Sequence, residues 1–385
     1  MGICNRWACW LLAVSCVQME LGCRADSGKS NARVIQAGNI PLMHALGFSL
    51  RKTGTTTVVE VHKPWQGATA DFTYILQSQS GKSGRDSLIV PVPLERVVTL
   101  TTTNLYQLQM LHVLGALVGV GGGRYVCNPV VRADLESGRI REVGGDMQVD
   151  VEAVLGVKPD LVFTFVVGNS SDGGMAKLAE ASIPTAIDGA YMEETPLGRA
   201  EWIKFTAAFF GKETMADSLY SEIDSAYAAL VALAGKAEHR PTVFVNAPFG
   251  GVWWMPGGRT YVARFLADAG ADYIWAQDST LGSLNLDLET VLAHAGHADF
   301  WFNPGDWRSL KEGREHDPRN AYFQAFKTGQ VYNNDRILTT GGGNDFFETG
   351  PSRPDWILAD LISILHPELL PKHTLRWYRK LEEKG

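Results

Sequence analysis

Hydrophobic and polar positions follow the same order twice along this chain. Residues 149–155 read Val-Asp-Val-Glu-Ala-Val-Leu, which predicts a helix with an aspartate at its N-cap and a glutamate in its first turn. The continuous apolar run 161–165 predicts a buried strand directly after it. Residues 286–292 (Leu-Asp-Leu-Glu-Thr-Val-Leu) and 300–302 repeat this helix–strand unit about 137 residues later. A repeat of this length is too long for a solenoid unit and predicts two similar lobes.

Strand and helix patterns alternate on both sides of the repeat. Because such alternation is typical of parallel sheets covered on both faces, each lobe is predicted to be α/β. The predicted strands cover residues 97–100, 117–120, 161–165, 184–187, 242–245, 300–302 and 330–332, and the predicted helices cover 105–114, 150–157, 173–182, 260–269, 287–295 and 354–366. Before them, residues 55–61, 72–76 and 88–93 predict a small hairpin that begins the first lobe.

A long helix is expected between the lobes, with one interruption at Gly211. Its second part has apolar residues at helical spacing, including Met215, Leu219 and Ile223. The fold class predicted is α/β, with two Rossmann-like lobes joined by one long linking helix, a cleft between the lobes and a small β-rich N-terminal addition. The expected boundaries are a signal peptide over 1–23, a flexible lead-in over 24–54, an N-terminal lobe over 55–200, the linking helix over 201–236, a C-terminal lobe over 237–372 and a tail over 373–385.

The amino-acid composition excludes some classes of function. The 385 residues are 45% hydrophobic and 20% charged, as expected for a folded protein. A net charge of -7 and the absence of any Lys/Arg-rich run exclude a nucleic-acid binder. Eleven Trp and eleven Tyr are more than two cores of this size need, so some are expected in a ligand cleft; additional core packing is the alternative.

The N-terminus predicts export. Residues 7–16 are apolar, too short to cross a bilayer and of the right length for the core of a signal peptide. Small residues before Cys16, and less well before Cys23, are similar to a bacterial lipoprotein cleavage site; a simple secretory signal cut before Asp26 is the alternative. The mature protein is therefore expected in the periplasm or lipid-anchored to a bacterial membrane. Only Cys127 lies beyond residue 23, which excludes a disulfide framework in the folded part.

Two α/β lobes, one linking helix, an export signal and an Asp-x-Glu helix in each lobe resemble the helical-backbone class of bacterial substrate-binding proteins. This class serves ABC importers of vitamin B12, haem and iron-siderophore complexes. The resemblance covers roughly residues 94–370 and is most specific in the run Lys-Pro-Asp-Leu-Val over 158–162 and in the paired glutamates. It implies a monomer with no catalytic residue and no cofactor, which delivers its ligand to a permease and its ATPase at the inner membrane.

The resemblance also assigns Glu152 and Glu289 to docking, because a glutamate on each lobe of these proteins binds arginines of the permease. Carboxylates in the first turn of a helix are stabilised by the helix dipole and form charge-assisted pairs with arginine. The alternative is that both are ordinary glutamates at helix starts.

The ligand is expected in the cleft, because ligands of α/β sheets bind beyond the carboxyl ends of the strands. Flat rings with a few polar groups suit a large organic ligand such as a corrinoid, a porphyrin or a siderophore. Which of these is bound stays open, as does the extent of lobe closure, although the stiff linking helix predicts small motions. The candidate ligand residues on the predicted cleft loops are Arg124, Tyr125, Tyr191, Glu194, Arg199, Trp253, Trp254, Trp307, Asn344 and Asp345.

Two other functions stay open: a chelatase-like or metal-cluster enzyme on the same bilobal plan, and a surface chelate-binding lipoprotein without a permease. His294 and His297 lack the further ligands that a zinc site needs, so no metal site is predicted. Asp345 and Glu348 are three residues apart but have no visible partner base, and their structural interpretation is preferred. No Gly-x-Ser-x-Gly, His-Glu-x-x-His or Walker motif is present.

Overall fold

The computed structural model describes residues 38–77, 87–144, 148–166 and 174–384, all within one compact unit, Ala37–Gly385. The predicted signal peptide, both candidate lipidation sites (Cys16 and Cys23) and residues 24–37 of the predicted lead-in lie outside the described residues. In the described part of the chain, no helix combines the length and the apolar character that a membrane crossing requires.

The N-terminal lobe has a five-stranded parallel sheet in the order β10-β9-β6-β7-β8. Its central strands are continuous apolar runs because both faces of the sheet are covered; every residue of β6 and β9 is buried. The strands are β6 (Val97–Thr99), β7 (Leu117–Val120), β8 (Arg141–Glu142), β9 (Leu161–Thr164) and β10 (Thr185–Ile187), and the helices are α1 (Thr103–Met110), α2 (Pro129–Glu136), α3 (Val151–Val157) and α4 (Gly174–Glu180).

The C-terminal lobe has its own five-stranded sheet, in the order β14-β11-β16-β17-β18, in which only β18 is antiparallel to its neighbour. Two separate sheets confirm the predicted two-lobe α/β class. The strands are β11 (Thr242–Val245), β14 (Asp272–Tyr273), β16 (Phe300–Phe302), β17 (Val331–Asn333) and β18 (Arg379–Lys380), and the helices are α8 (Tyr261–Asp268), α9 (Leu288–Ala295), α10 (Leu310–His316), α11 (Gln324–Lys327), α12 (Asp345–Glu348) and α13 (Pro354–Leu365).

The sequence repeat corresponds to the units α3–β9 and α9–β16. Asp150 caps α3 by accepting the N–H of Ala153 at 2.9 Å, and Asp287 caps α9 by accepting the N–H of Thr290 at 2.7 Å. The hydrogen bond from Thr290 lowers the pKa of Asp287, so this cap stays ionised. Both predicted N-caps are confirmed.

A second pair of aspartates joins each repeat to the first strand of its sheet. Asp160 Oδ2, just before β9, accepts the N–H groups of Glu95 and Arg96 at 3.0 and 2.8 Å. Asp299 Oδ2, just before β16, accepts the N–H of Thr242 at 2.8 Å and its hydroxyl at 2.7 Å. The two lobes therefore use the same carboxylate contact at equivalent places.

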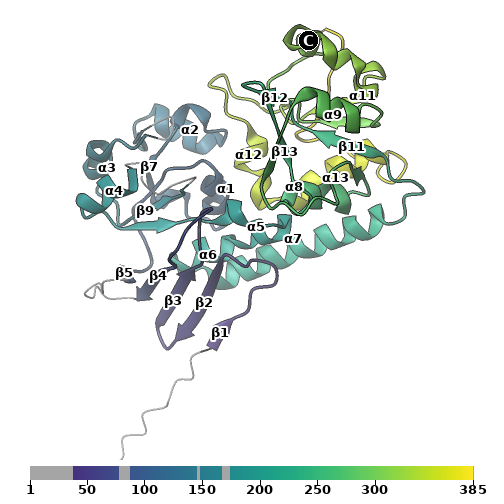
Figure 1. The fold of residues 1–385 in the computed structure, drawn as a ribbon. Coiled ribbons are helices and arrows are strands. Elements are labelled where there is room, and N and C mark those ends of the chain that lie inside the picture. Colours follow the sequence, from purple (N-terminus) through teal and green to yellow (C-terminus); the bar gives the residue numbers. More distant parts are fainter. Residues whose placement is uncertain (1–37, 78–86, 145–147, 167–173, 385) are drawn as a thin grey trace, which may run out of the picture. The chain divides into compact units, whose positions relative to one another are not determined.

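The predicted linking segment 201–236 is three helices and not one. Helix α5 (Pro196–Glu201) contacts α8 and α13 of the C-terminal lobe, whereas helix α6 (Ile203–Ala208) contacts α1 of the N-terminal lobe. The chain then turns through Gly211, whose φ of 62° favours glycine. Helix α7 (Glu213–Ala234) follows and contacts both α6 and α13 of the C-terminal lobe (Figure 1). Helices α5, α6 and α7 together therefore connect the two lobes.

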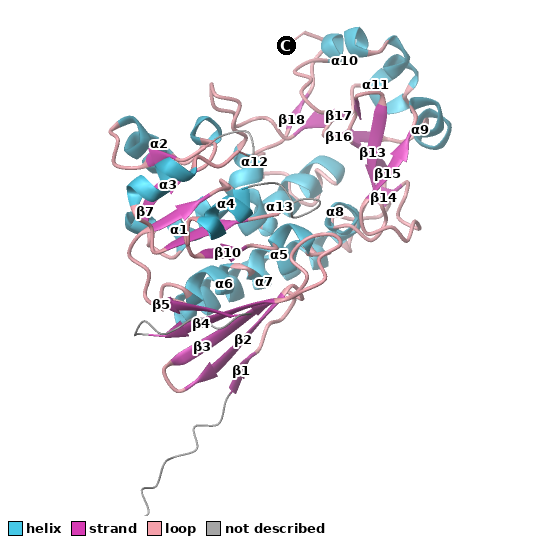
Figure 2. Ribbon diagram, turned by 60° about the vertical axis from the view of Figure 1, so that its left-hand side comes forward, coloured by secondary structure: helices cyan, strands magenta, loops and turns pink. Residues whose placement is uncertain are grey.

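The β-rich addition is larger than the predicted hairpin. Strands β1 to β5 form a separate five-stranded sheet in chain order, antiparallel except for the β4–β5 pair (Figure 2). It packs on the N-terminal lobe through one hydrophobic cluster, in which Phe48 and Tyr74 contact Trp202, Phe205 and Phe209. Its strands are β1 (Gly38–Ile40), β2 (Phe48–Thr53), β3 (Thr56–Val61), β4 (Phe72–Gln77) and β5 (Ser87–Pro91).

The prediction of a flexible lead-in is wrong for residues 38–53, because two buried carboxylates hold this segment in place. Glu201 accepts the N–H groups of Met43, His44 and Ala45 at 2.7–3.0 Å. Glu193 accepts those of Leu46 and Gly47, the latter at 2.8 Å, and also the indole N–H of Trp202 at 2.9 Å. Lys204 neutralises Glu201 at 3.0 Å.

Two further expectations for the C-terminal lobe are corrected. The predicted tail contains β18, and its Trp377 and Tyr378 are buried in the core. The predicted loop around 249–254 is a hairpin of β12 (Pro248–Phe249) and β13 (Val252–Pro256), which β15 (Ser283–Leu286) extends to three strands. Hydrogen bonds between these strands, which a single-strand pattern does not reveal, convert the loop into a sheet.

Replacing Glu201 tests the carboxylate contact. Glu201→Ala leaves three backbone N–H groups without their acceptor and leaves the buried Lys204 ammonium with only the exposed Asp217, 3.3 Å away, as a partner. Breaking such a buried pair costs roughly 3–5 kcal/mol. We expect the free energy of unfolding, measured by urea denaturation, to fall by about that amount. The exposed Glu222→Ala on α7 is the control and should change it by about 0.5 kcal/mol or less. Equal stability of the two variants would contradict the contact's importance.

Candidate functional site

The strand-end loops of the two lobes touch each other directly. Residues 121–128 follow β7 in the N-terminal lobe, and residues 338–348 follow β17 in the C-terminal lobe. A Cβ atom at Gly341 would lie 2.2 Å from the Arg124 carbonyl oxygen, and one at Gly343 would lie 2.1 Å from that of Tyr125. Only glycine fits at these two positions, so the triple glycine over 341–343 permits close contact between the backbones of the two lobes.

A carboxylate of one lobe binds backbone of the other beside this contact. Glu348 on α12 is 2% exposed, and its two oxygens accept the N–H groups of Cys127 and Asn128 at 2.7 Å each. These groups lie just before α2, where the helix dipole also favours negative charge. Burial, with a smaller contribution from Asp345, nevertheless raises the pKa of Glu348 to about 7. The carboxylate is therefore close to titration near neutral pH.

A second contact between the lobes involves two predicted ligand residues. The guanidinium of Arg199 lies over the ring of Tyr261, 3.4 Å from its centroid, and donates to the Tyr191 carbonyl oxygen at 2.5 Å. Burial lowers the pKa of Arg199 from its ordinary value. Glu194 pairs with Arg259 at 3.4 Å, and both side chains are exposed. Tyr261 and Arg259 belong to the C-terminal lobe, so Glu194 and Arg199 face a partner across the lobes.

Among the predicted aromatic ligand residues, Trp253 and Trp307 are corrected. Trp253 is completely buried and donates its indole N–H to the Val245 carbonyl at 2.9 Å, and Trp307 packs edge-on against Trp301. Both belong to the core of the C-terminal lobe. Trp254 points the other way on the same strand and is 46% exposed. It is available to a ligand.

The predicted ligand residues Tyr191, Arg124, Tyr125 and Asn344 already form contacts within the protein. Tyr191 donates its hydroxyl hydrogen to the Val166 carbonyl at 2.6 Å, and Arg124 lies over the ring of Tyr125, 4.4 Å from the centroid, and donates to the Tyr125 hydroxyl. Asn344 is the N-cap of α12 and accepts the Phe346 N–H at 3.0 Å.

Asp345 is also corrected as a ligand residue. It is buried, with Oδ1 accepting the Thr349 hydroxyl at 2.7 Å and Oδ2 accepting the indole N–H of Trp377 at 2.8 Å. Arg376 lies 3.4 Å from the same Oδ2. The hydrogen bonds of Asp345 therefore hold α12 against the C-terminal residues.

Both predicted docking glutamates are exposed in the first turns of their helices. They differ in their neighbours. Glu289, 69% exposed, forms an ion pair with Arg319 at 2.5 Å, and Arg319 is also held by Asp317 at 2.7 Å. Glu152 has no comparable ion pair among the described residues.

The two histidines considered as metal ligands, His294 and His297, lie at the end of α9 and in the turn after it. His294 Nδ1 lies 2.8 Å from the Thr290 carbonyl oxygen of its own helix. Among the described residues, no three His, Cys, Asp or Glu side chains gather into a group that could hold a metal ion.

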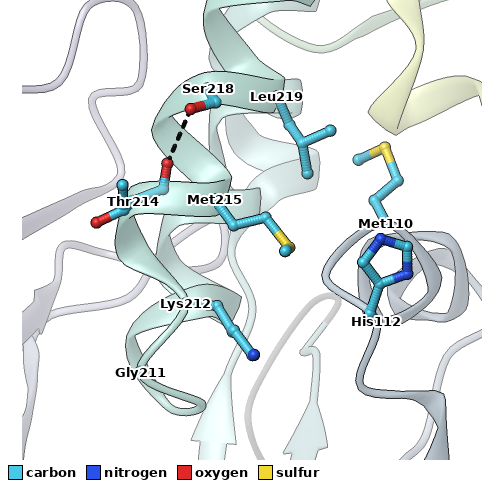
Figure 3. A pocket seen from close by; sticks show the side chains of 8 residues that line it. All are labelled: Met110, His112, Gly211, Lys212, Thr214, Met215, Ser218 and Leu219. Carbon is cyan, nitrogen blue, oxygen red and sulfur yellow. Dashed lines mark hydrogen bonds between the residues drawn. The ribbon is translucent and has the colours of Figure 1, made fainter.

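A pocket of about 560 Å³ lies between the end of α1 and the start of α7 (Figure 3). Its floor is apolar, with the side chains of Met110 and Met215 pointing into the space between the helices. None of the predicted ligand residues lines it. The lining residues are Met110, His112, Gly211, Lys212, Thr214, Met215, Ser218 and Leu219.

Sequence reasoning missed Tyr261, Arg259 and the role of Glu348. Tyr261 and Arg259 stand at the start of the predicted helix 260–269, where the helix pattern gave them no separate meaning. The contact of Glu348 with Cys127 and Asn128, about 220 positions away, has no local signal in the sequence.

The family model for periplasmic binding proteins matches residues 97–337. An uncharacterised lipoprotein of Methanocaldococcus jannaschii, MJ0878, is 26% identical over 310 residues, which cover 78% of this chain and 72% of that protein.

Solved structures share the fold. A possible iron-binding (periplasmic solute-binding) protein of Staphylococcus epidermidis aligns with a TM-score of 0.55 and 17% identity, covering 71% of this chain and 99% of its own. A periplasmic haem-binding protein of Pseudomonas aeruginosa aligns with a TM-score of 0.54 and 19% identity, covering 71% of this chain and 93% of its own. At these identities the likeness concerns the fold alone.

The reactivity of Cys127 tests the burial of the contact between the lobes. Burial, followed by the negative charge of Glu348, raises the pKa of the Cys127 thiol to about 12. Since only the thiolate reacts, we expect alkylation by iodoacetamide at about pH 8 to be roughly a thousandfold slower than for an ordinary thiol. Peptide mass spectrometry over time measures it, with the urea-unfolded chain as the control. Equal rates in the folded and unfolded chains would contradict the geometry.

Proposed function

Since the chain belongs to the periplasmic binding protein family, we propose that it is the substrate-binding component of an ABC importer. It captures an iron chelate (a siderophore complex or haem) or a corrinoid between its lobes and delivers it to a membrane permease and its ATPase. It acts as a monomer after export, in the periplasm or anchored through a lipid on Cys16 or Cys23. The family is one of binding proteins, which favours this function over a chelatase-like enzyme.

The observation that carries the proposal is the duplicated helix start. Asp150 and Asp287 cap equivalent helices in two lobes, and each cap sets an exposed glutamate in the following first turn. A partner that binds both lobes at once would meet two equivalent negative groups. Arginines of a permease fit them, because a carboxylate pairs with a guanidinium through charge-assisted hydrogen bonds.

The proposed ligand contacts are the residues that remain after the core residues are removed from the set. They supply ring faces, two guanidinium groups and two polar groups, a combination that suits a large planar or chelated organic ligand with acidic substituents. Arg199 is the strongest candidate for such a substituent, because its guanidinium is half-buried and already oriented by Tyr261. The set is Arg124, Tyr125, Tyr191, Glu194, Arg199, Trp254 and Asn344.

Ligand titration tests the capture step. Addition of haem, cobalamin and a ferric hydroxamate siderophore to the purified protein should change the visible absorbance of one of them and quench tryptophan fluorescence. Because Trp254 is the exposed member of the predicted tryptophans, Trp254→Phe should reduce the quenching, and Trp307→Phe in the core should reduce it less. A protein that responds to none of the three would carry another cargo.

Transport tests the docking glutamates. Replacing Glu152 and Glu289 together by Ala should lower uptake of the ligand by about tenfold or more, because each lost charge-assisted contact is worth roughly 1.5–3 kcal/mol. Ligand affinity, measured by titration, should stay unchanged. The matched control replaces Glu136 and Glu315, one exposed carboxylate from each lobe, and should leave both quantities unchanged. Normal uptake by the Glu152/Glu289 variant would remove the docking assignment.

A further inference from the structure

The contact of Glu348 with the segment before α2 joins the two lobes through a charge that is buried when they touch. Glu348 belongs to the C-terminal lobe, whereas the two N–H groups that it accepts belong to Cys127 and Asn128 of the N-terminal lobe. Asn128 is in turn fixed, because its Oδ1 caps α2 by accepting the N–H of Val130 at 3.0 Å and its Nδ2 donates to Gln109 at 2.5 Å. The donors are therefore held rigidly in the N-terminal lobe.

Where Glu348 binds the N-terminal lobe, the two lobes are also in direct backbone contact. The backbone contacts at Gly341 and Gly343 leave no room for a side chain between the loops. A small separation of the lobes at this edge therefore breaks both hydrogen bonds of Glu348 and admits water to its carboxylate. Contact and separation are two distinct environments for one titratable group.

The charged groups around Glu348 are few. On its own helix, Asp345 is the nearest, and its carboxylate is engaged by Trp377 and Arg376. Helix α1, which contacts α12, carries no acidic or basic residue along Thr103–Met110. On the following turn, Arg353 is paired with Asp355 at 2.5 Å.

On α2, Arg132 is the charged residue that acts on the neighbouring Cys127. The Cys127 thiol has a pKa raised to about 12, so it stays protonated at neutral pH and adds no charge of its own. Among the residues that the structure describes, none of these cations forms an ion pair with Glu348, whose charge is stabilised by the two N–H groups and the dipole of α2.

We propose that Glu348 is a proton-sensitive contact that holds the two lobes together at this edge, more tightly when its carboxyl group is protonated. Protonation takes one proton from solvent and removes the buried charge, while the neutral carboxyl oxygen still accepts an N–H group. Its meaning for transport rests on the proposed function: it would make retention of the ligand between the lobes depend on pH.

The direction follows from proton linkage. In the contact, burial raises the pKa of Glu348 from its ordinary value of 4.5 to about 7. When the lobes separate, water returns and the pKa falls toward the ordinary value. The contact therefore binds the proton more strongly than the separated state, so its stability is fully present below the ordinary pKa and is lost as the pH rises to about 7.

Amide hydrogen exchange in the ligand-free protein tests the proposal. The protection factors of the Cys127 and Asn128 amides, corrected for intrinsic exchange at each pH, report how often the contact opens. Between about pH 6 and about pH 8 we expect these protection factors to fall by about tenfold. Proton linkage changes the opening equilibrium about tenfold for each pH unit that lies between the two pKa values of Glu348, and only the unit from pH 6 to pH 7 does so here. Protection that is constant or rises over this range would overturn the proposal.

The variant Glu348→Gln removes the titration and keeps the shape of the side chain. Its protection at Cys127 and Asn128 should be independent of pH, whereas the exposed control Glu222→Gln should keep the wild-type dependence. A pH dependence that persists in Glu348→Gln would assign it to another group and overturn the proposal. If this variant does not fold, the wild-type profile still decides the matter. No ligand is used, so a failure of the proposed function leaves the result unaffected.

Discussion

Carboxylates that accept backbone N–H groups from remote segments fix the arrangement of this chain. Segments outside helices and sheets have N–H groups with no regular partner, and burying such a group unpaired is costly. A single carboxylate can satisfy two or three of them, as Glu201 does for residues 43–45 and as Asp360 does for the N–H groups of Arg376 and Trp377. Through these contacts, the segment before β2 is attached to Glu201, about 157 positions later in the chain, and the segment before β18 is attached to Asp360, 16 positions earlier.

Local sequence patterns predicted most of the fold. The Asp caps of α3 and α9, the buried strands β9 and β16 and the two-lobe plan follow from periodicity and capping, which depend on residues a few positions apart. The lead-in and the tail could not be predicted in the same way. Their order depends on contacts such as Met43 with Glu201, 158 positions apart, which no local pattern contains.

The candidate site shows the same limit at the level of single side chains. Trp253 and Trp254 are adjacent, and alternation along a strand turns one inward and the other outward. The signal that distinguishes them was present: Gly250 and Gly251, both at positive φ (60° and 82°), separate Phe249 from Val252 as a two-residue hairpin turn does. The partnership of Glu348 with Cys127, in contrast, depends on how the two lobes meet and has no counterpart in the sequence pattern.

The repeat was retained most closely where backbone geometry requires it. Asp160 and Asp299 fasten equivalent strands, and Asp150 and Asp287 cap equivalent helices, because a change at either place would leave N–H groups unpaired. The exposed glutamates Glu152 and Glu289 have no such role in holding the backbone, and their neighbouring residues differ between the lobes. Glu289 is paired with Arg319, whereas Glu152 has no such pair within the described chain.

An exposed ion pair of this kind contributes little to stability, since water competes for both groups. Arg319 therefore orients the Glu289 carboxylate without blocking it, and an arginine of a partner can replace Arg319 at little cost. The two lobes thus offer the same charge at the same helix position but with different preorganisation. A partner that binds both would meet a carboxylate paired with Arg319 in the C-terminal lobe and one without such a pair among the described residues in the N-terminal lobe, which makes the two halves of one interface energetically unequal.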